Sequence, residues 1–395
     1  MQKKLTNYNH TIYASYGGYI CLAIVNNFAP LLFLTFQREF DLTLQDVTLI
    51  TTINFLVQLT VDLLCAKFVD KIGYRICLVA AHVSVTLGFV GLAVLPGLLP
   101  AYTGILMAVV FYAIGGGIIE VLISPVVEAC PTEKKEAAMS LLHSFFCWGH
   151  VAVVLLSTAF FTLFGIRHWR IMACVWALVP ACNALYFSQV PLFPIVSEEE
   201  KMPIGGLLKR KTFWLLIVMM ICAGASEQAV SQWVSTFAET ALHISKTMGD
   251  LLGVCAFAFL MGTARALYGK YSDSIPLKRM MILSAAACIL CYLLAAFTVS
   301  PIWGLLGCAC CGFTVGIFWP GTFSAAALAL PGGGTAMYAF MALAGDLGCS
   351  SGPTVVGTVA NHSGGDLRRG IAVAMIFPIA MLVSTALMKF QKQRT

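Results

Sequence analysis

The chain has 395 residues, of which 59% are hydrophobic and only 11% are charged, and its mean hydropathy is +0.87. Soluble domains carry about 25% charged residues, so this composition excludes a single soluble core and indicates an integral membrane protein. The net charge of +6 is expected to reflect loop residues that set membrane orientation, and it gives no reason to propose a nucleic-acid partner.

No sequence pattern indicates a metal site, a cofactor or an enzyme active site. The 15 cysteines are scattered through apolar runs, where buried thiols act as small hydrophobic side chains. The 7 histidines form no H-E-x-x-H pair, and there is no phosphate-binding G-x-x-x-x-G-K-S/T loop. We therefore predict neither bound metal nor ATP coupling within the chain.

Apolar runs that are long enough to cross a bilayer recur along the whole chain, since a spanning helix needs about 20 residues. We expect twelve spans, near residues 11–36, 47–69, 75–97, 100–130, 137–165, 168–190, 212–238, 247–269, 279–298, 301–330, 335–360 and 367–389. The predicted fold is all-α, with twelve transmembrane helices in two six-helix, pseudo-symmetric halves.

A long polar stretch lies between the sixth and seventh spans. It predicts an N-terminal bundle at 1–190, a cytoplasmic linker at 191–211 and a C-terminal bundle at 212–395. Most Lys and Arg residues fall on the side that holds both termini, so we expect both termini in the cytoplasm. The expected location is the cell (inner) membrane.

Two short segments of the first half recur in the second half. Residues 67–70, Lys-Phe-Val-Asp, have a counterpart in residues 270–273, and residues 117–125 have one in residues 312–320. Parallel repeats of this kind describe the two halves of one transporter architecture, whose substrate site lies between them near the midplane.

Residues 66–75 resemble the loop 2–3 signature of the major facilitator superfamily, G-x-x-x-D-R/K-x-G-x-R/K. Asp70, Lys71, Gly73 and Arg75 match it, and Ala66 replaces its first glycine. With twelve expected spans and a central linker, the resemblance covers essentially the whole chain. It implies that this loop helps to latch the halves on the cytoplasmic side, and the repeat adds Asp273 to that gate.

A narrower resemblance lies in the fourth and fifth spans. Glu120, five residues before Pro125, and the segment 142–149 look like the fucose permease branch of proton–sugar symporters. That resemblance implies proton coupling by Glu120. The polar amides of the family's fifth helix are not retained, because the nearest positions hold His143 and Phe146.

Acidic side chains inside apolar runs are the first candidates for a functional site. A charge at membrane depth costs roughly 3 kcal/mol or more, so it marks a functional site by default. We expect Glu120 to face a central cavity, and we name Glu120, His143, Asp346 and Glu227 as proton-coupling candidates. Asp346 is equally a candidate partner for Arg265, which also lies inside a span and needs a counter-charge.

Amides and indoles inside the spans are candidates for contacts with a polar substrate. They are Asn26, Asn27, Asn54, Gln58, Gln228, Gln232, Trp233, Trp148 and Trp319. The amides can equally serve as structural hydrogen-bonding groups between helices, and the indoles can equally fill helix interfaces.

These features favour a secondary active transporter that works by alternating access, with proton-coupled uptake of a small polar solute such as a sugar. One alternative is a proton-antiport exporter of amphipathic compounds or metabolites. Another is a membrane receptor that transports nothing. The expected partners are the solute, protons and the lipid bilayer, and we expect a monomer.

Overall fold

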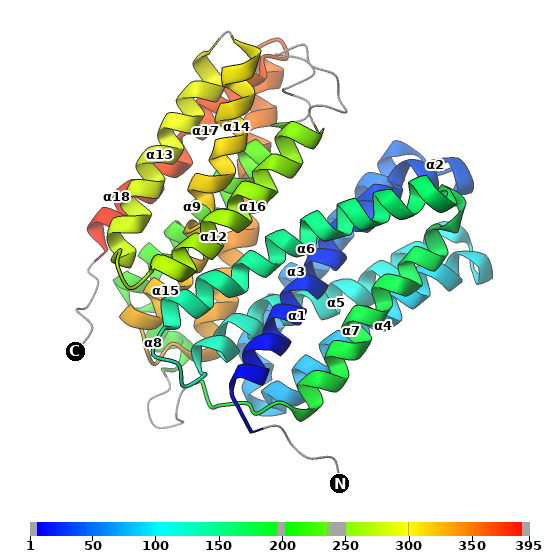
Figure 1. Ribbon diagram of the computed structural model, residues 1–395, viewed down its shortest axis with the longest axis horizontal. Helices are drawn as coiled ribbons and strands as arrows, with labels where there is room; N and C mark the ends of the chain where they lie inside the picture. The colour runs from blue at the N-terminus through cyan, green and yellow to red at the C-terminus, as the bar shows by residue number, and fades with distance from the viewer. Residues whose placement is uncertain (1–5, 196–201, 235–236, 238–249, 299, 389–395) are drawn as a thin grey trace. The chain divides into compact units, whose positions relative to one another are not determined.

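The computed structural model describes residues 6–195, 202–234, 237, 250–298 and 300–388 (Figure 1). Every regular element in these ranges is a helix. Ten helices in them are long and apolar enough to cross a membrane. The chain is therefore an all-helical membrane protein, as its composition predicts.

The ten helices coincide with ten of the twelve expected spans. At the other two, 247–269 and 335–360, the structure has the helices α12 (Ala256–Tyr271) and α16 (Gly334–His362), which are not among the ten. A carboxylate, Asp346, lies in the middle of α16 and lowers its hydropathy. Residues 247–249 of the predicted eighth span lie outside the described residues.

The chain divides into two compact units. The first unit comprises Met1–Thr132 and Trp148–Ile195, and the second comprises Glu133–Cys147 and Val196–Thr395. The division falls within the long helix α6 (Lys135–Phe164), which contributes its beginning to the second unit and the rest to the first.

The other helices of the first unit follow one another through short connections. They are α1 (Asn9–Asn27), a 3-10 turn (Ala29–Leu32), α2 (Phe33–Phe40), α3 (Leu44–Ile72), α4 (Tyr74–Leu98), α5 (Ala101–Glu128), a 3-10 turn (Ile166–His168) and α7 (Trp169–Gln189).

Local sequence determines where α3 begins and ends. The Thr43 hydroxyl accepts a hydrogen bond from the Asp46 backbone N–H, and the Asp46 carboxylate accepts from the backbone N–H of Thr43 at 2.9 Å. This capping box satisfies free N–H groups at the helix start. Hydrogen bonds from the side chain and backbone of Thr43 lower the pKa of Asp46. The helix ends at Gly73, whose φ of 97° suits glycine.

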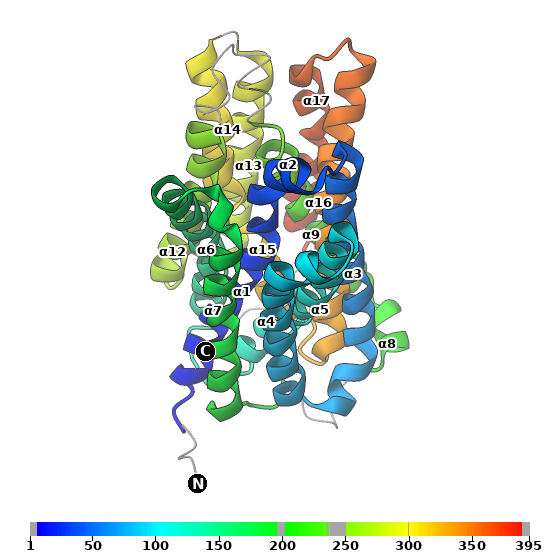
Figure 2. The ribbon, with the colours of Figure 1, turned by 90° about the vertical axis from the view of Figure 1, so that its right-hand side faces the viewer.

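Close backbone contact joins α4 to α5, which make the most extensive helix–helix contact of the first unit (Figure 2). A Cβ at Gly115 would lie 2.3 Å from the Ala81 carbonyl oxygen, and one at Gly88 would lie 2.5 Å from the Tyr112 nitrogen. Small residues allow this approach, which is the usual means of packing helices in lipid.

The remaining helices of the second unit begin with α8 (Ile204–Leu208) and α9 (Lys211–Ser231). They continue with a one-turn π-helix (Asp250–Cys255), α12, α13 (Leu277–Phe297), α14 (Pro301–Val315), α15 (Phe318–Ala329), α16, α17 (Leu367–Ala374) and α18 (Ile376–Leu387).

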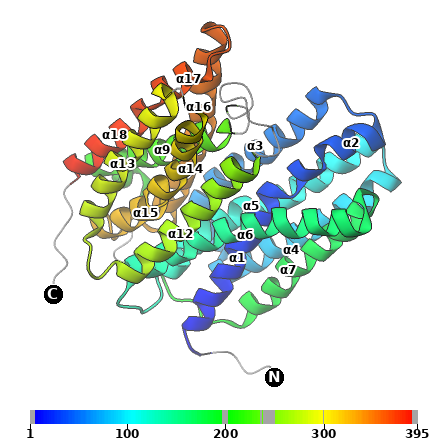
Figure 3. The same cartoon turned by 45° about the horizontal axis from the view of Figure 1, so that its top comes forward.

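Glycines also join α9 to α16, the most extensive helix pair of this unit (Figure 3). A Cβ at Gly224 would lie 2.2 Å from the Gly345 carbonyl oxygen, and one at Gly348 would lie 2.2 Å from the Ile221 carbonyl oxygen. The two units therefore use the same device for their closest helix contact.

Three predicted spans are not continuous α-helices. The span 11–36 changes to a 3-10 turn at Ala29–Leu32, 301–330 is interrupted between α14 and α15, and 367–389 between α17 and α18. A proline lies at or just beyond each interruption, and its nitrogen cannot donate to the carbonyl four residues earlier. The prolines are Pro30, Pro320 and Pro378.

Candidate functional site

Three predicted substrate-binding amides form one hydrogen-bonded cluster in the first unit. Gln58 Nε2 on α3 donates to Asn26 Oδ1 on α1 at 3.0 Å and to Asn54 Oδ1 at 3.2 Å. Asn54 Nδ2 donates to the same Asn26 oxygen at 3.4 Å. The structure thus brings together residues from two helices, and we name Asn26, Asn54 and Gln58 the amide cluster.

The amide cluster has an unused acceptor. Gln58 is 1% exposed, and its Oε1 has no hydrogen-bond partner within the described residues. A buried polar atom without a partner is costly, about 1–3 kcal/mol. Glycines on α5 allow Gln58 to lie this close: a Cβ at Gly116 would lie 3.3 Å from its Nε2.

Glu120 lies one turn beyond Gly116 on the same face of α5, since it follows at i+4. Its side chain is half-buried. On α3, Asp62 follows Gln58 at the same interval and is fully buried. Because Gly116 contacts Gln58, the facing sides of α3 and α5 each carry an acid one turn further along the chain.

Two other candidates of the first unit lie outside the amide cluster. Asn27 Nδ2 donates to the Ala23 carbonyl of its own helix at 2.8 Å. Trp148 is half-buried on α6. Their substrate roles stay predictions.

The gate motif of the first unit has local partners. The Tyr74 hydroxyl donates to Asp70 Oδ1 at 2.6 Å, while Lys71 is exposed and Gly73 forms the turn. The Arg75 guanidinium donates to the last carbonyls of α7, those of Phe187, Ser188 and Val190, at 2.8–3.0 Å. Arg75 therefore caps a helix C-terminus, where carbonyls need donors.

In the second unit, a buried arginine on α12 donates to acceptors from several segments of the chain. Arg265 Nη2 lies 3.4 Å from Glu227 Oε2 on α9, and the side chains are 3% and 12% exposed. Arg265 Nε donates to the Gly316 carbonyl at 2.8 Å. Its Nη1 donates to the His143 carbonyl and lies 3.1 Å from Cys147 Sγ, both on α6. We name these residues the arginine cluster.

The predicted pairing of Arg265 with Asp346 is wrong, because Glu227 takes that place. Asp346 lies on α16 with 7% exposure, and its Oδ2 has no hydrogen-bond partner within the described residues. Asp346 is therefore a buried acid without a cationic partner among them. This leaves open its other predicted role, as a group that binds a proton or a substrate.

The remaining candidates of the second unit are spread over α9 and the elements around it. Gln228 Oε1 accepts from the Ser231 hydroxyl at 3.2 Å, and Gln232 is exposed. Trp233 Nε1 donates to the Pro353 carbonyl of α16 at 3.0 Å. The hydrogen bond of Trp233 fits the structural alternative for that indole, and the substrate roles of the two glutamines stay predictions.

Trp319 and His143 share an aromatic neighbour on α15. The Phe323 ring lies 6.4 Å from the Trp319 ring and 5.8 Å from the His143 ring, centroid to centroid. The Trp319 indole also covers Gly345, where a Cβ would lie 2.2 Å from its Cη2. Trp319 thus lies directly beside the residue that precedes Asp346.

Asp273, the predicted gate residue of the second unit, pairs with Lys134 just before α6. One turn deeper, the Tyr268 hydroxyl donates to Glu136 at 2.9 Å. The hydrogen bond to Asp273 and the charge of its carboxylate raise the pKa of Lys134.

The spacing of Asn54, Gln58 and Asp62 predicts one polar stripe on α3, and the burial of Asp62 makes it a candidate as well. Sequence reasoning missed other members of these clusters. Cys147 and the Gly316 carbonyl carried no signal, since thiols and glycines are common in apolar helices. A buried pair in the first unit, Asn183 Nδ2 and His82 Nε2 at 2.9 Å, was also missed and ties α7 to α4.

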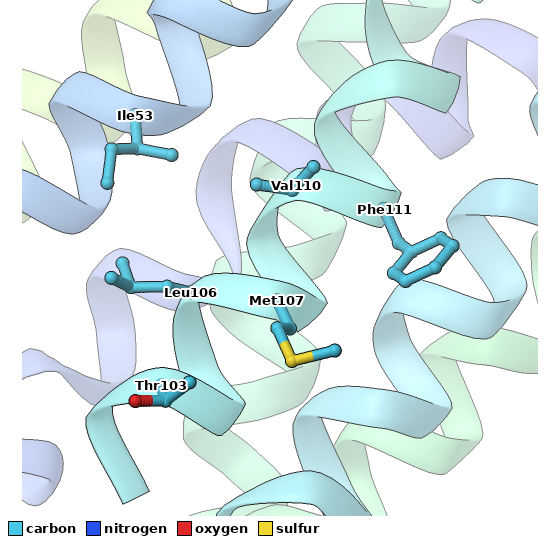
Figure 4. Close-up of a pocket in the computed structure, with 6 residues that line it drawn as sticks. All are labelled: Ile53, Thr103, Leu106, Met107, Val110 and Phe111. Carbon is cyan, nitrogen blue, oxygen red and sulfur yellow. The ribbon is translucent and has the colours of Figure 1, made fainter. Parts of the chain in front are cut away.

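A groove of about 460 Å³ on the first unit is a different kind of feature (Figure 4). Apolar side chains of α3 and α5 line it together with one hydroxyl; the residues are Ile53, Thr103, Leu106, Met107, Val110 and Phe111. This lining offers almost no hydrogen bonds, so the groove does not suit a polar solute.

A comparison with known protein families identifies the class to which this helical membrane protein belongs. Residues 16–353 match the model of the Major Facilitator Superfamily. The chain belongs to this superfamily, which confirms the resemblance of its loop signature. It is a transporter and not an enzyme.

Particular relatives are more distant. The Membrane protein MosC of Rhizobium meliloti is 23% identical over 295 residues, which are 73% of this chain and 69% of MosC. FucP in an outward conformation matches with a TM-score of 0.82 at 14% identity, over 96% of this chain and 99% of FucP. The proton:xylose symporter XylE matches with a TM-score of 0.77 at 14% identity, over 96% and 94%.

Proposed function

We propose that the chain is a secondary active transporter that works by alternating access and couples the uptake of a small polar solute, such as a sugar, to protons. The observation that carries this proposal is the presence of acids in helices of an otherwise apolar protein, Glu120 half-buried and Asp62 and Asp346 buried, together with the amide cluster. Polar groups at membrane depth are costly and mark substrate or proton pathways.

The similar structures support the choice of solute and ion. FucP is a fucose:proton symporter and XylE is a proton:xylose symporter. At 14% identity these likenesses establish the fold, so the sugar and the proton are inferences for this chain.

The proposed architecture has twelve membrane helices in two six-helix halves, 1–190 and 212–395, joined by a cytoplasmic linker. The helices α12 and α16, added to the ten apolar helices, support this number. We place both termini in the cytoplasm, the protein in the cell (inner) membrane, and a single chain as the working unit.

In this proposal Glu120 binds the driving proton, and His143, Glu227 and Asp346 are further candidates for its path. The amide cluster supplies hydrogen bonds to solute hydroxyls. Gln58 Oε1, the unused acceptor, suits a hydroxyl that donates. The halves would rock about the site while Asp70 and Asp273 contribute to the cytoplasmic gate.

A proton-antiport exporter is the second candidate function. The observation that favours it is Asp346, whose buried carboxylate has no cationic partner among the described residues and could bind a cationic compound. Such a site would exchange the compound for protons.

The direction of coupled flux separates the two proposals. The protein is reconstituted in liposomes, a pH gradient is imposed, and labelled fucose, xylose and an amphipathic cation are tested in turn. Symport predicts accumulation of a sugar on the alkaline side. Accumulation of the cation on the acidic side would replace symport with antiport, and movement that ignores the gradient would contradict both.

A further inference from the structure

The interruption between α14 and α15 lies at residues 316–317, and a proline, Pro320, follows in the first turn of α15. Pro320 has no N–H, so the carbonyl four residues earlier, that of Gly316, cannot receive its helical hydrogen bond. A buried carbonyl without a donor is costly, about 1–3 kcal/mol, so this group needs a partner from elsewhere.

Arg265 supplies that partner from another helix. Its Nε donates to the Gly316 carbonyl at 2.8 Å. The absence of a side chain at Gly316 allows the approach, because a Cβ there would lie 3.0 Å from the Ala264 Cβ and 3.1 Å from the Met261 carbonyl oxygen.

The guanidinium itself is held by its remaining contacts. Glu227 balances its charge, and α6 provides the His143 carbonyl and the Cys147 sulfur. A guanidinium has five N–H donors. The four contacts to Gly316, Glu227, His143 and Cys147 use most of them and leave little for a solute.

The Gly316 carbonyl that Arg265 contacts lies just before α15. This helix carries Trp319, a predicted substrate-binding residue. Trp319 directly precedes Pro320, and its indole covers Gly345. The next residue is Asp346, the buried acid whose Oδ2 has no hydrogen-bond partner among the described residues. A continuous series of contacts therefore leads from Glu227 through Arg265 and Gly316 to the indole beside Asp346.

We propose that Arg265, held by Glu227, is a positioning residue: it secures the carbonyl that Pro320 leaves free at Gly316 and thereby sets the Trp319 indole against Gly345, beside Asp346. In this arrangement Glu227 acts as the partner that holds Arg265. The value of this geometry for transport rests on the proposed function, whereas the geometry itself can be tested without a substrate.

The test follows Trp319 by ¹⁹F NMR in the full-length protein labelled with 5-fluorotryptophan. The Trp319 line is assigned from its loss in Trp319→Phe. Arg265→Lys keeps a cation for Glu227 but lacks the planar fork that reaches several acceptors at once. We expect the Trp319 line to shift by more than its width in Arg265→Lys and, in the same direction, in Glu227→Gln.

Two matched controls show whether the effect is specific. Trp214, whose indole donates to the Leu208 carbonyl in the same unit, should keep its line in every variant. Pro320→Ala restores an N–H that competes with Arg265 for the Gly316 carbonyl, so it should also shift the Trp319 line. Pro125→Ala, the repeat counterpart on α5, should not.

An unchanged Trp319 line in folded Arg265→Lys and Glu227→Gln would overturn the proposal. If Arg265→Lys fails to fold, the Trp319 line in Glu227→Gln and Pro320→Ala is the test, and an unchanged line in both would overturn the proposal. A shift of all tryptophan lines together would also contradict it, because that pattern indicates general loosening.

A transport measurement adds the functional consequence. Where a solute has been found, Arg265→Lys should raise the KM more than it lowers kcat, and the effect should vanish in the Trp319→Phe background, since the two residues act as one unit. Equal effects in both backgrounds would contradict the functional part. If no solute moves at all, the proposed function fails, while the NMR result still decides the positioning.

Discussion

The helix α5 and the pair α14–α15 are repeat counterparts in sequence, yet only one of them is continuous. Each carries a proline at the matching place, Pro125 and Pro320. The helix α5 passes through Pro125 without interruption, whereas the second unit breaks just before Pro320. The difference teaches that a proline alone does not break a membrane helix; at the break, a guanidinium from another helix takes the free carbonyl.

The two units also differ in where their acids lie. In the first unit Glu120 lies on the proline-containing helix itself, and the neighbouring polar cluster consists of neutral amides. In the second unit the position that matches Glu120 in the repeat is Val315, and the acids come from α9 and α16. We therefore expect substitutions in the arginine cluster to destabilise the protein more than substitutions in the amide cluster.

The largest effect is expected from Arg265→Leu. It leaves Glu227 as a buried charge without its partner, and breaking a buried pair this way costs about 3–5 kcal/mol. Thermal unfolding in detergent, followed by the fraction of protein that stays monodisperse, should show a large loss. The double variant Arg265→Leu/Glu227→Leu should recover much of it, and a double variant as unstable as the single one would contradict this account.

The second-largest loss of thermal stability is expected from Gly224→Ala, because the new Cβ would lie 2.2 Å from the Gly345 carbonyl oxygen. Overpacking of this kind costs about 1–3 kcal/mol. Gly115→Ala in the first unit meets the Ala81 carbonyl oxygen at 2.3 Å and should cost the same. Gly205→Ala, with no atom within 4 Å, is the control. If all three melted alike, glycine packing would not explain the contacts.

A smaller effect is expected from Gln58→Leu in the amide cluster. It removes two hydrogen bonds worth about 0.6 kcal/mol each in membrane proteins. It also removes Gln58 Oε1, an acceptor with no hydrogen-bond partner in the described part of the chain, so stability should fall by less than about 1 kcal/mol while solute binding is lost. Gln189→Leu, at a half-buried glutamine that donates to the Leu185 carbonyl of its own helix at 3.2 Å, is the control for melting and uptake. A loss as large as that of Arg265→Leu would erase the contrast between the units.

The smallest effect is expected at the exposed pair of Lys134 and Asp273. Because the Asp273 carboxylate raises the pKa of Lys134 above its ordinary 10.5, the pair stabilises the fold below that pH and ceases to do so as the pH rises through the raised value. In Asp273→Asn the pKa of Lys134 should return toward 10.5, as measured by NMR titration of the ¹³C-methylated lysine. Salt should weaken the pair, and an unchanged titration would disprove it.

Most of the helices could be predicted because an apolar segment in lipid must satisfy its backbone internally. The span predicted at 75–97 is α4 (Tyr74–Leu98), and that at 279–298 is α13 (Leu277–Phe297). The interruption in 301–330 could not be predicted, since Pro125 and Pro320 look alike in sequence. What distinguishes them is Arg265, a residue far from Gly316 along the chain.

The site was predictable in part, for a similar reason. Spacing alone placed Asn54 and Gln58 on one face, and their hydrogen bond confirms it. Spacing did not reveal which acid would pair with Arg265, because the pairing depends on which faces of α9 and α16 are turned toward α12. Glu227 and Asp346 were equivalent in sequence, and only packing separates the paired acid from the one that lacks a cationic partner among the described residues.

The central claim, that an acid within a membrane helix carries the proton that drives uptake, is tested most directly by Glu120→Gln in liposomes with an imposed pH gradient. The account predicts that this variant no longer accumulates the solute against its gradient but still exchanges it in counterflow, because the binding site remains while the proton site is lost. Accumulation equal to that of the parent protein would contradict the account.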